Sequence, residues 1–379
     1  MPLLQTGLDR LAEDSTLDPL VRSLRSRTVA LLSHPASVSR AYRHASDVLA
    51  DLGVHPILLF GPEHGYGGEA QYMAPVADGA ARTGVRIRSL YGDRAEDLAP
   101  VAADFEGIDV LVIDLQDVGS RYYTYVWTAL LSARVALAAG TEVVILDRPN
   151  PLGGIALEGK LPVDPLYLSF VGLEPLPVRH GLTLGAIVEK FLGRPDERLQ
   201  VIAVRGWNER ELARGWDRDF VQTSPNMPTA DTALVYPGGC LLEGCNLSEG
   251  RGTCRPFEIV GAPFLEGPAL ARALRETKLP GFVARPLSFV PTFEKHAGEL
   301  CEGVQIHVTD PHTFRPVATY AALLACAHRL APRAFEFRTT PYEFRDDVPA
   351  LDLLFGGPAL REAIFRDTEP HDVAALCEL

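Results

Sequence analysis

The sequence predicts an α/β protein, with a Rossmann-like, open, mainly parallel sheet and a second, smaller α+β domain at the C-terminal end. Three observations indicate this fold class. Short runs of Val, Ile and Leu recur through the first part of the chain, each run is apolar throughout, and segments of helical period lie between them. Uninterrupted apolar runs are typical of strands that are buried on both faces, as in a parallel sheet.

Five such runs are the expected strands of the large sheet: Val29–Leu32, Ile57–Phe60, Val110–Ile113, Val143–Leu146 and Val201–Val204. Each expected helix between them stops at a glycine just past the periodic segment, which is a common helix end. These helices are Arg40–Leu52 before Gly53, Thr124–Ala139 before Gly140, and Thr183–Phe191 before Gly193.

The pattern changes near residue 230. Residues 231–263 are dense in Gly, Pro and small side chains, and the chain beyond them mixes two strand-like pieces, Phe282–Val290 and Val304–Val308, with one clear helix, Tyr320–Leu330. We therefore expect two domains: residues 1–232 form the Rossmann-like domain with the catalytic loops, and residues 233–379 form the smaller domain that closes the cleft.

The composition restricts the class of protein. The chain has 379 residues, 47% of them hydrophobic and 22% charged, which is typical of a globular protein. A net charge of −13 disfavours nucleic acid as a partner. The N-terminus has no signal-peptide pattern, no apolar stretch reaches the roughly 18 residues of a membrane span, and the six cysteines form no C-x-x-C pair. These features predict a cytoplasmic protein with free thiols and no membrane partner; its oligomeric state stays open.

Polar residues follow the expected strands at the points where they end. Ligands of open α/β sheets bind beyond the carboxyl ends of the strands, so these residues are the first candidates for a site. The first strand ends in Ser33-His34-Pro35, and the other candidates are Glu63 and His64 after the second strand, Asp114, Gln116, Asp117, Arg121 and Tyr123 after the third, and Arg148 and Asn150 after the fourth.

Further candidates lie in later stretches that Gly and Pro punctuate. Rigid turns that present His, Asn, Glu and Arg suit a polyhydroxylated ligand, whose hydroxyl groups need paired donors and acceptors. The residues in these turns are His180, Asn226, Asn246, Glu249 and Arg251.

Several other chemistries find little support. Residues 65–70 match a dinucleotide fingerprint, but the segment after them contains Pro75 and Gly79 and has no helical period, so we expect no nucleotide. There is no H-E-x-x-H motif, no Cys/His quartet and no G-x-S-x-G elbow. Carboxylates and a histidine at the strand ends could in principle ligate a divalent ion, but we expect neither a metal nor another cofactor.

The motifs FGPEHGYGGEA, DLQDVGSRYYTY, LDRPNP, SFVG, RHG, SPNMPT, YPG, EGCNLSEGRGT and PFEIVGAP occur in this order. With this series the sequence resembles the bacterial exo-β-N-acetylmuramidase family, formerly a domain of unknown function. It departs from the family at Ser33–Ser37, where an Asn-Gln-Thr-Gly type of loop is usual, and at Cys245, where Thr is common. The resemblance implies a glycoside hydrolase that removes N-acetylmuramic acid (MurNAc) from the non-reducing end of peptidoglycan fragments, in cell-wall turnover or recycling.

Cleavage of a glycosidic bond usually needs two carboxyl groups. We expect Glu63 to be the general acid, because it follows a buried strand and partial desolvation favours a protonated carboxyl group. Asp114 or Asp117 is the expected second carboxylate, with Glu249 in reserve, and His64 is expected to orient the reacting groups. Retaining and inverting chemistry both stay open.

MurNAc also carries a lactyl carboxylate, which needs a local cation in so acidic a protein. Arg121, Arg148 and Arg251 are the candidates, and His180 is a candidate for binding hydroxyl groups. Two other classes remain as alternatives. One is a different enzyme on similar fragments, a MurNAc-ether lyase or a metal-dependent hydrolase, and the other is a non-catalytic muropeptide-binding sensor.

Overall fold

The computed structural model describes residues 3–71, 74–81 and 84–379, and the chain divides into two compact units. The first unit comprises Met1–Val118, Tyr123–Gly153 and Leu182–Pro228, and the second comprises Gly119–Tyr122, Gly154–Gly181 and Thr229–Leu379. Neither unit is a single stretch of sequence. The expected domain boundary between residues 232 and 233 stays a prediction.

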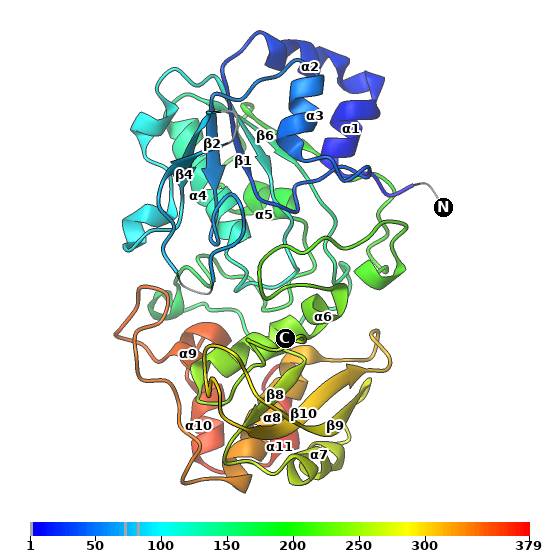
Figure 1. Cartoon of the computed structure of the whole chain (residues 1–379), viewed down its shortest axis with the longest axis vertical. Helices are drawn as coiled ribbons and strands as arrows, with labels where there is room; N and C mark the ends of the chain where they lie inside the picture. The colour runs from blue at the N-terminus through cyan, green and yellow to red at the C-terminus, as the bar shows by residue number, and fades with distance from the viewer. Residues whose placement is uncertain (1–2, 72–73, 82–83) are drawn as a thin grey trace. The chain divides into compact units, whose positions relative to one another are not determined.

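The first unit is built on a seven-stranded sheet with the order β3-β4-β2-β1-β5-β6-β7. Strands β1, β2, β4 and β6 of this sheet are labelled in Figure 1. All neighbouring strands run parallel except β3 and β4 at one edge. The strands are β1 (Val29–Ser33), β2 (Leu58–Gly61), β3 (Gly79–Ala80), β4 (Arg86–Ser89), β5 (Val110–Asp114), β6 (Glu142–Leu146) and β7 (Leu199–Ile202). The predicted mainly parallel α/β sheet is thus confirmed.

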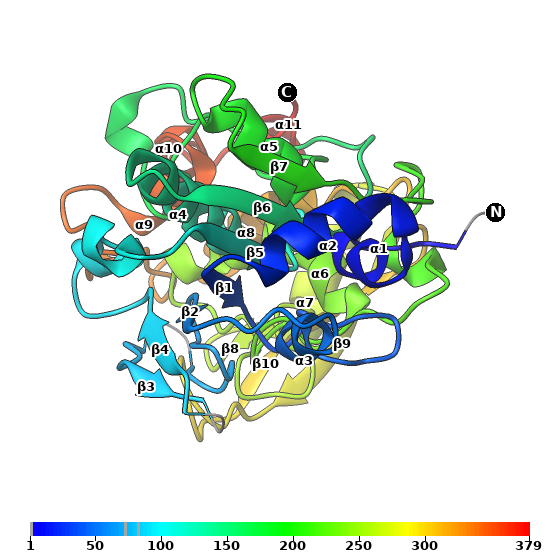
Figure 2. The same ribbon diagram turned by 90° about the horizontal axis from the view of Figure 1, so that it is seen from above.

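Helices cover both faces of this sheet. Helices α1 (Gly7–Glu13), α2 (Asp18–Arg25) and α3 (Ala45–Asp51) lie on one side, and α4 (Tyr125–Ala138) and α5 (Leu184–Phe191) lie on the other (Figure 2). Alternate strand residues face the first group of helices, and together they form a continuous buried core that includes Leu8, Leu24, Val29, Leu31, Leu49, Leu59, Val110, Val112, Val144, Leu146 and Ile202.

Two sequence-based expectations need correction. The helix expected at Arg40–Leu52 begins only at Ala45, because Tyr42 adopts a left-handed backbone (φ 57°) that a right-handed helix cannot contain. The strand expected at Val201–Val204 lies two residues earlier, since pairing with β6 joins Val143 to Leu199. Strand β4 was not predicted, and its first three residues are not fully buried and therefore lack the apolar pattern of the central strands.

The second unit holds a three-stranded antiparallel sheet, which confirms the predicted α+β domain. Its strands have the order β8-β10-β9, with β8 at Ile259–Ala262, β9 at Phe282–Phe289 and β10 at Cys301–Val308. Strands β8 and β10 approach so closely that a Cβ on Gly303 would lie 1.9 Å from the carbonyl oxygen of Val260, so no other residue fits there. The helices are α6 (Ala230–Gly239), α7 (Gly267–Glu276), α8 (Pro316–Leu330), α9 (Ala350–Phe355), α10 (Ala359–Phe365) and α11 (Pro370–Ala375).

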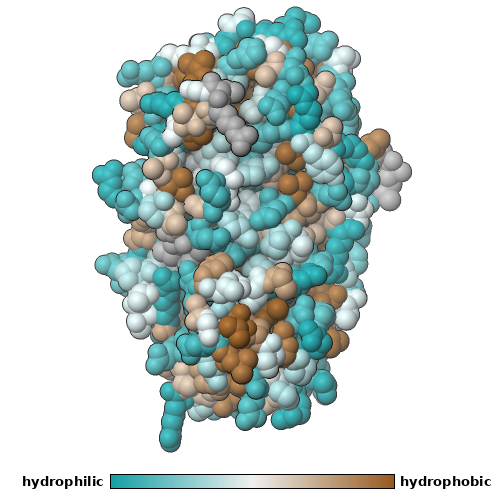
Figure 3. Space-filling view, viewed as in Figure 1, coloured by the Kyte–Doolittle hydropathy of each residue, from teal (hydrophilic) through white to brown (hydrophobic). Residues whose placement is uncertain are grey.

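The surface is mostly hydrophilic on the face in Figure 3, where brown apolar side chains occur in small groups among teal and white ones. Scattered apolar residues of this kind are ordinary for a protein surface. Within the described part of the chain, every helix is too short or too polar to span a lipid bilayer.

Candidate active site

The chemistry-bearing loops of the first unit gather at the carboxyl ends of β1, β2, β5 and β6. The chain adds β2 and β4 on one side of β1 and then β5, β6 and β7 on the other, so the strand order reverses between β1 and β5. Such a switch point is where open α/β sheets bind ligands. His34 follows β1 and Asp114 ends β5, which brings both residues to this point.

Glu63 lies two residues beyond β2 and is 8% exposed. Its Oε2 accepts a hydrogen bond of 2.7 Å from the hydroxyl group of Thr124. Thr124 is the N-cap of α4, yet its hydroxyl caps no helical amide and serves Glu63 instead. Among the described residues, no hydrogen-bond partner reaches the other oxygen, Oε1, so Glu63 is held by one oxygen and can offer the other to a ligand.

His64 has a left-handed backbone with φ 71°, which is uncommon for a residue with a side chain and marks local strain. Gly65 follows with φ 82° and completes the turn. The Nδ1 of His64 lies 2.8 Å from the carbonyl oxygen of Ala70, which can only accept a hydrogen bond, so Nδ1 carries the proton. The Nε2 atom of a neutral His64 is therefore an acceptor.

Asp114 and Arg148 form a buried, two-pronged ion pair. Arg148 donates from Nε to Oδ1 of Asp114 at 2.5 Å and from Nη2 to Oδ2 at 2.9 Å, while the two side chains are only 3% and 0% exposed. Nη2 also donates to the carbonyl oxygen of Val38 at 3.1 Å. Both carboxylate oxygens of Asp114 are thus occupied, whereas Nη1 of Arg148 has no hydrogen-bond partner among the described residues.

His34 is a structural member of this region. Its Nε2 accepts a 3.0 Å hydrogen bond from the backbone N–H of Gln116, and its Nδ1 lies 3.3 Å from the carbonyl oxygen of Thr223. These partners require a neutral ring with the proton on Nδ1. Burial, together with the nearby Arg148, lowers the pKa of His34 to about 3, which agrees with a neutral ring.

The remaining candidates of the first unit fix loops at the same edge. Hydrogen bonds join the amide of Gln116 to the carbonyl oxygens of Asp117 and Pro149, Asn150 to Leu182 and Leu152, Asn226 to Gln71, and Tyr123 to the hydroxyl of Thr223. Asp117 is buried, at 3% exposure.

Two residues of this region, Thr124 and Thr223, were not among the candidates from the sequence; Thr124 contacts Glu63 directly, and Tyr125 links Glu63 to Thr223. The hydroxyl of Tyr125 lies 3.3 Å from the carbonyl oxygen of Glu63 and 3.1 Å from that of Thr223. The sequence marks Thr124 only as a typical N-cap residue before an apolar periodic segment, and that pattern does not reveal its bond to Glu63. Nothing in the local sequence marks Thr223.

Glu249 and Arg251 belong to a charge network inside the second unit. Arg251 bridges Glu249 at 2.6 Å and Glu243 at 2.8 Å, and Lys295 donates to Glu249 at 2.9 Å. The burial of Glu249 opposes its charge, but Lys295 and Arg251 outweigh that effect and hold its pKa at about 2. Tyr342 donates to Glu243 at 2.7 Å, so the network ties several segments of this unit together.

The three other candidates of the second unit are also engaged. Arg121 is fully buried and donates to the carbonyl oxygens of Lys160 at 2.7 Å and Leu176 at 3.0 Å, and also to that of Leu354. Burial lowers the pKa of Arg121 to about 10, so the guanidinium keeps its charge at neutral pH. The amide of Asn246 holds residues 334 and 336, and His180 is buried at 3% exposure.

The described residues contain no group of three or more His, Cys, Asp or Glu side chains placed to hold a metal ion. No helix follows the glycines of residues 65–68 within residues 70–71 and 74–79, so the expected helical context of a dinucleotide fingerprint is missing there.

The fold of this chain, over nearly its whole length, recurs in solved structures. A DUF1343 family protein from Bacteroides fragilis NCTC 9343 is similar with a TM-score of 0.84 and 27% identity, covering 99% of this chain and 94% of its own. A second DUF1343 family protein from this organism has a TM-score of 0.70 and 24% identity, over 98% and 93% of the two chains, and shares the fold.

The chain belongs to the exo-β-N-acetylmuramidase NamZ family. The model of the N-terminal domain of this family matches residues 29–231, and that of the C-terminal domain matches residues 234–378. The peptidoglycan β-N-acetylmuramidase NamZ of Bacillus subtilis (strain 168) is 39% identical over 343 residues, which are 89% of this chain and 81% of the relative. The resemblance noted in the sequence is thereby confirmed.

Proposed function

We propose that this protein is an exo-β-N-acetylmuramidase, a glycoside hydrolase that releases MurNAc from the non-reducing end of peptidoglycan fragments. Family membership supports the reaction, and one observation supports the assignment of the acid. Glu63 lies at the sheet edge with Oε2 bonded to Thr124 and with Oε1 open to a ligand.

In this mechanism Glu63 protonates the leaving oxygen. The hydroxyl of Thr124 donates to Oε2, so the acidic proton of Glu63 resides on Oε1. As the bond between the anomeric carbon and the glycosidic oxygen breaks, the oxygen keeps the bonding electrons and takes this proton. Water then adds to the anomeric carbon, and its proton passes to a base, so free MurNAc and a shortened fragment leave the site.

The second carboxyl role falls to Asp117 in our proposal. Asp114 remains near the site, but both of its carboxylate oxygens are bonded to Arg148, which suits a structural anchor better than a base that activates water. His64 is the second polar side chain beside the acid, and we assign it to the orientation of the substrate. Gln116, Asn150 and the other loop residues position these groups.

Arg148 is the best candidate for recognition of the lactyl carboxylate. Arg121 is fully buried and binds main-chain carbonyls, and the two terminal nitrogens of Arg251 bind Glu243 and Glu249. Arg148 keeps Nη1 free of protein partners among the described residues while Asp114 fixes the plane of the guanidinium. A rigid donor of this kind is well suited to a carboxylate.

The decisive experiment compares Glu63→Gln with the wild type on the β-linked disaccharide of MurNAc and N-acetylglucosamine, because a sugar leaving group needs the proton that a nitrophenolate would not. Removal of a general acid should lower turnover by about 10²–10⁴-fold. Glu69→Gln is the matched control, because Glu69 lies in the same loop but is exposed. Wild-type turnover by Glu63→Gln would remove Glu63 from the mechanism, and equal cleavage of the matching β-N-acetylglucosaminide would show that the lactyl group is not read.

Product analysis separates the alternative functions. An ether lyase would release lactate, a metal-dependent hydrolase would stop when a chelator is added, and a muropeptide sensor would bind the disaccharide without producing free sugar. Each of these outcomes would replace the proposed reaction.

We further propose a cytoplasmic role in cell-wall recycling. All six cysteines are free thiols and five of them are buried, which suits a reducing compartment. Cell fractionation with an antibody against the protein tests this location, and recovery outside the cytoplasm would contradict it.

A further inference from the structure

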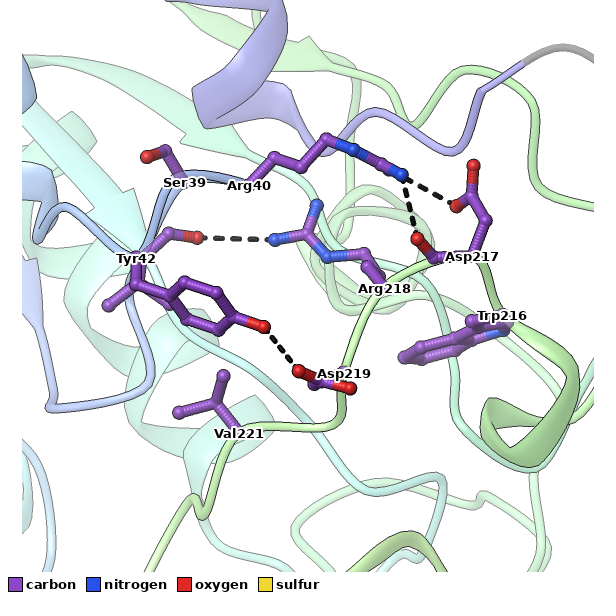
Figure 4. A pocket seen from close by; sticks show the side chains of 9 residues that line it. Ser39, Arg40, Tyr42, Trp216, Asp217, Arg218, Asp219 and Val221 are labelled. Carbon is purple, nitrogen blue, oxygen red and sulfur yellow. Dashed lines mark hydrogen bonds and ion pairs between the residues drawn. The ribbon is translucent and has the colours of Figure 1, made fainter.

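The first unit contains a polar cavity of about 230 Å³, and Glu63 is not among the residues that line it (Figure 4). One wall is the loop after β1, residues 38–42, and the other is the segment of residues 216–221. Figure 4 shows Tyr42 and Trp216 on opposite sides with Arg218 between them. Neither Tyr42 nor Trp216 belongs to the site described above.

The two walls are tied across the cavity by charged groups. Arg40 donates to the carbonyl oxygen of Asp217 at 2.7 Å and to its carboxylate at 3.2 Å, and the hydroxyl of Tyr42 donates to Asp219. Behind them, Asp9 accepts from Arg218 at 2.6 Å and from the backbone of Arg40 at 2.7 Å. The polar groups are therefore held in place before any ligand arrives, which lowers the entropic cost of binding.

Tyr42 carries two unusual features at the mouth of the cavity. Its side chain is 60% exposed, and its backbone has φ 57° in the left-handed region. Burial of the ring does not offset this strain, although the hydroxyl group donates to Asp219. An exposed aromatic ring in a strained turn is typical of a residue that contacts a ligand.

The charges of the lining disfavour an anionic ligand. Arg40 and Arg218 are balanced by Asp217 and Asp219, and Asp9 adds a further negative charge behind them. A bound anion would face these carboxylates. Aromatic faces beside carboxylates and guanidinium groups suit a pyranose ring, since the ring has apolar C–H faces and equatorial hydroxyl groups that need both donors and acceptors.

The cavity adjoins the candidate active site through one carbonyl group. The oxygen of Val38 accepts from Nη2 of Arg218 at 3.4 Å and from Nη2 of Arg148 at 3.1 Å. The two nitrogens are therefore at most 6.5 Å apart, the sum of these distances. Arg148 in turn binds Asp114 at the end of β5, so the cavity lies at the same edge of the sheet.

We infer that this cavity is a subsite for an uncharged pyranose, the sugar on the leaving side of the scissile bond. This assignment rests on the proposed exo-muramidase function. The volume is below the range of about 300–1,000 Å³ that accommodates larger ligands, so the cavity takes one ring and leaves the rest of the fragment in solvent. Asp219 and Arg40 bind hydroxyl groups, and Tyr42 packs on a ring face.

The test compares two substrates with the same MurNAc unit. One is a β-linked disaccharide whose leaving group is N-acetylglucosamine, and the other is a β-MurNAc glycoside whose leaving group is nitrophenol. Asp219→Asn should lower kcat/KM for the disaccharide about tenfold, because a hydrogen bond to a charged group is weakened, and should leave the nitrophenyl glycoside unchanged. Asp51→Asn is the control, since Asp51 pairs with exposed Arg43 outside the cavity.

A second measurement does not need turnover. Calorimetric titration with free N-acetylglucosamine should show binding to the wild type and to Asp51→Asn, and at least tenfold weaker binding to Asp219→Asn and Tyr42→Ala. If both substrates react but Asp219→Asn affects neither, or affects both equally, the subsite is refuted. If the wild type cleaves neither substrate, the proposed function fails, and the titration alone decides: selective loss of sugar binding in the variants supports the cavity, and no binding by the wild type refutes it.

Discussion

The buried pair of Asp114 and Arg148 should control the stability of the first unit. Replacement of Arg148 by Met removes the cation while the carboxylate of Asp114 stays fully buried. Two hydrogen bonds to a charged group are lost, at 2.5 and 2.9 Å, and each is worth about 1.5–3 kcal/mol. The expected loss in the free energy of unfolding is therefore about 3–5 kcal/mol, the usual cost of leaving one buried charge unpaired.

The double variant Asp114→Asn, Arg148→Met should recover much of that loss, because no buried charge then lacks a partner. A double-mutant cycle should give a coupling energy of at least about 2 kcal/mol between the two side chains. Urea unfolding followed by tryptophan fluorescence is the assay. All three tryptophans, Trp127, Trp207 and Trp216, lie in the first unit, so their signal reports on that unit.

The exposed pair of Arg43 and Asp51 provides the contrast, with side chains 49% and 57% exposed. Arg43→Met should cost less than about 1 kcal/mol, because water screens an exposed ion pair. The reasoning is refuted if Arg148→Met costs no more than Arg43→Met, or if the single effects of the buried pair simply add. Either result would mean that Asp114 is not held as a charged anchor.

Three further predictions concern single positions. Thr124→Val should lower kcat by about 10–100-fold and shift the pH profile of activity, because Glu63 loses its 2.7 Å hydrogen bond. Thr124→Ser keeps the hydroxyl group and should retain most activity. Equal loss in both variants would argue against a role for the hydroxyl group. The pKa of Glu249 lies near 2, against an ordinary 4.5, so its charge stabilises the fold by about 3 kcal/mol above pH 4.5. This stabilisation disappears as the pH falls from 4.5 to 2. Urea unfolding followed by circular dichroism should therefore depend less on pH over this range for Glu249→Gln than for the wild type. Gly65→Ala should lower the free energy of unfolding by about 1 kcal/mol, because Gly65 has a φ of 82° and the added Cβ would lie 3.0 Å from Val76. Thermal unfolding measures this change, and an unchanged Tm would show that the turn relaxes freely.

The central strands of the large sheet were predictable, because a strand buried on both faces shows up as a run of adjacent apolar residues. Val110–Asp114 is buried at every position, and its first four residues form the uninterrupted apolar run that such a strand needs. The false helix start at Arg40 shows the limit of this reasoning. The residues before Ala45 allow a helix by composition, but Tyr42 takes a left-handed backbone, and no local pattern announces that choice.

The candidate site divides in the same way. The position of Glu63 and His64 after a buried strand was readable from the sequence, since strand ends follow from the apolar pattern. The hydroxyl group that holds Glu63 comes from Thr124, 61 residues away, and no periodicity links the two.

The sequence by itself determined the α/β class, the positions of the main strands along the chain and the loops that carry candidate catalytic groups, because burial and turn formation depend on neighbouring residues. Only the tertiary structure decided which charges meet. Asp114 pairs with Arg148 across 34 residues, and Arg40 meets Asp217 across 177, so one carboxylate becomes an anchor and a cavity forms beside it. The physical reason is that an ion pair depends on distance in space, and distance in space follows from the packing of the whole sheet.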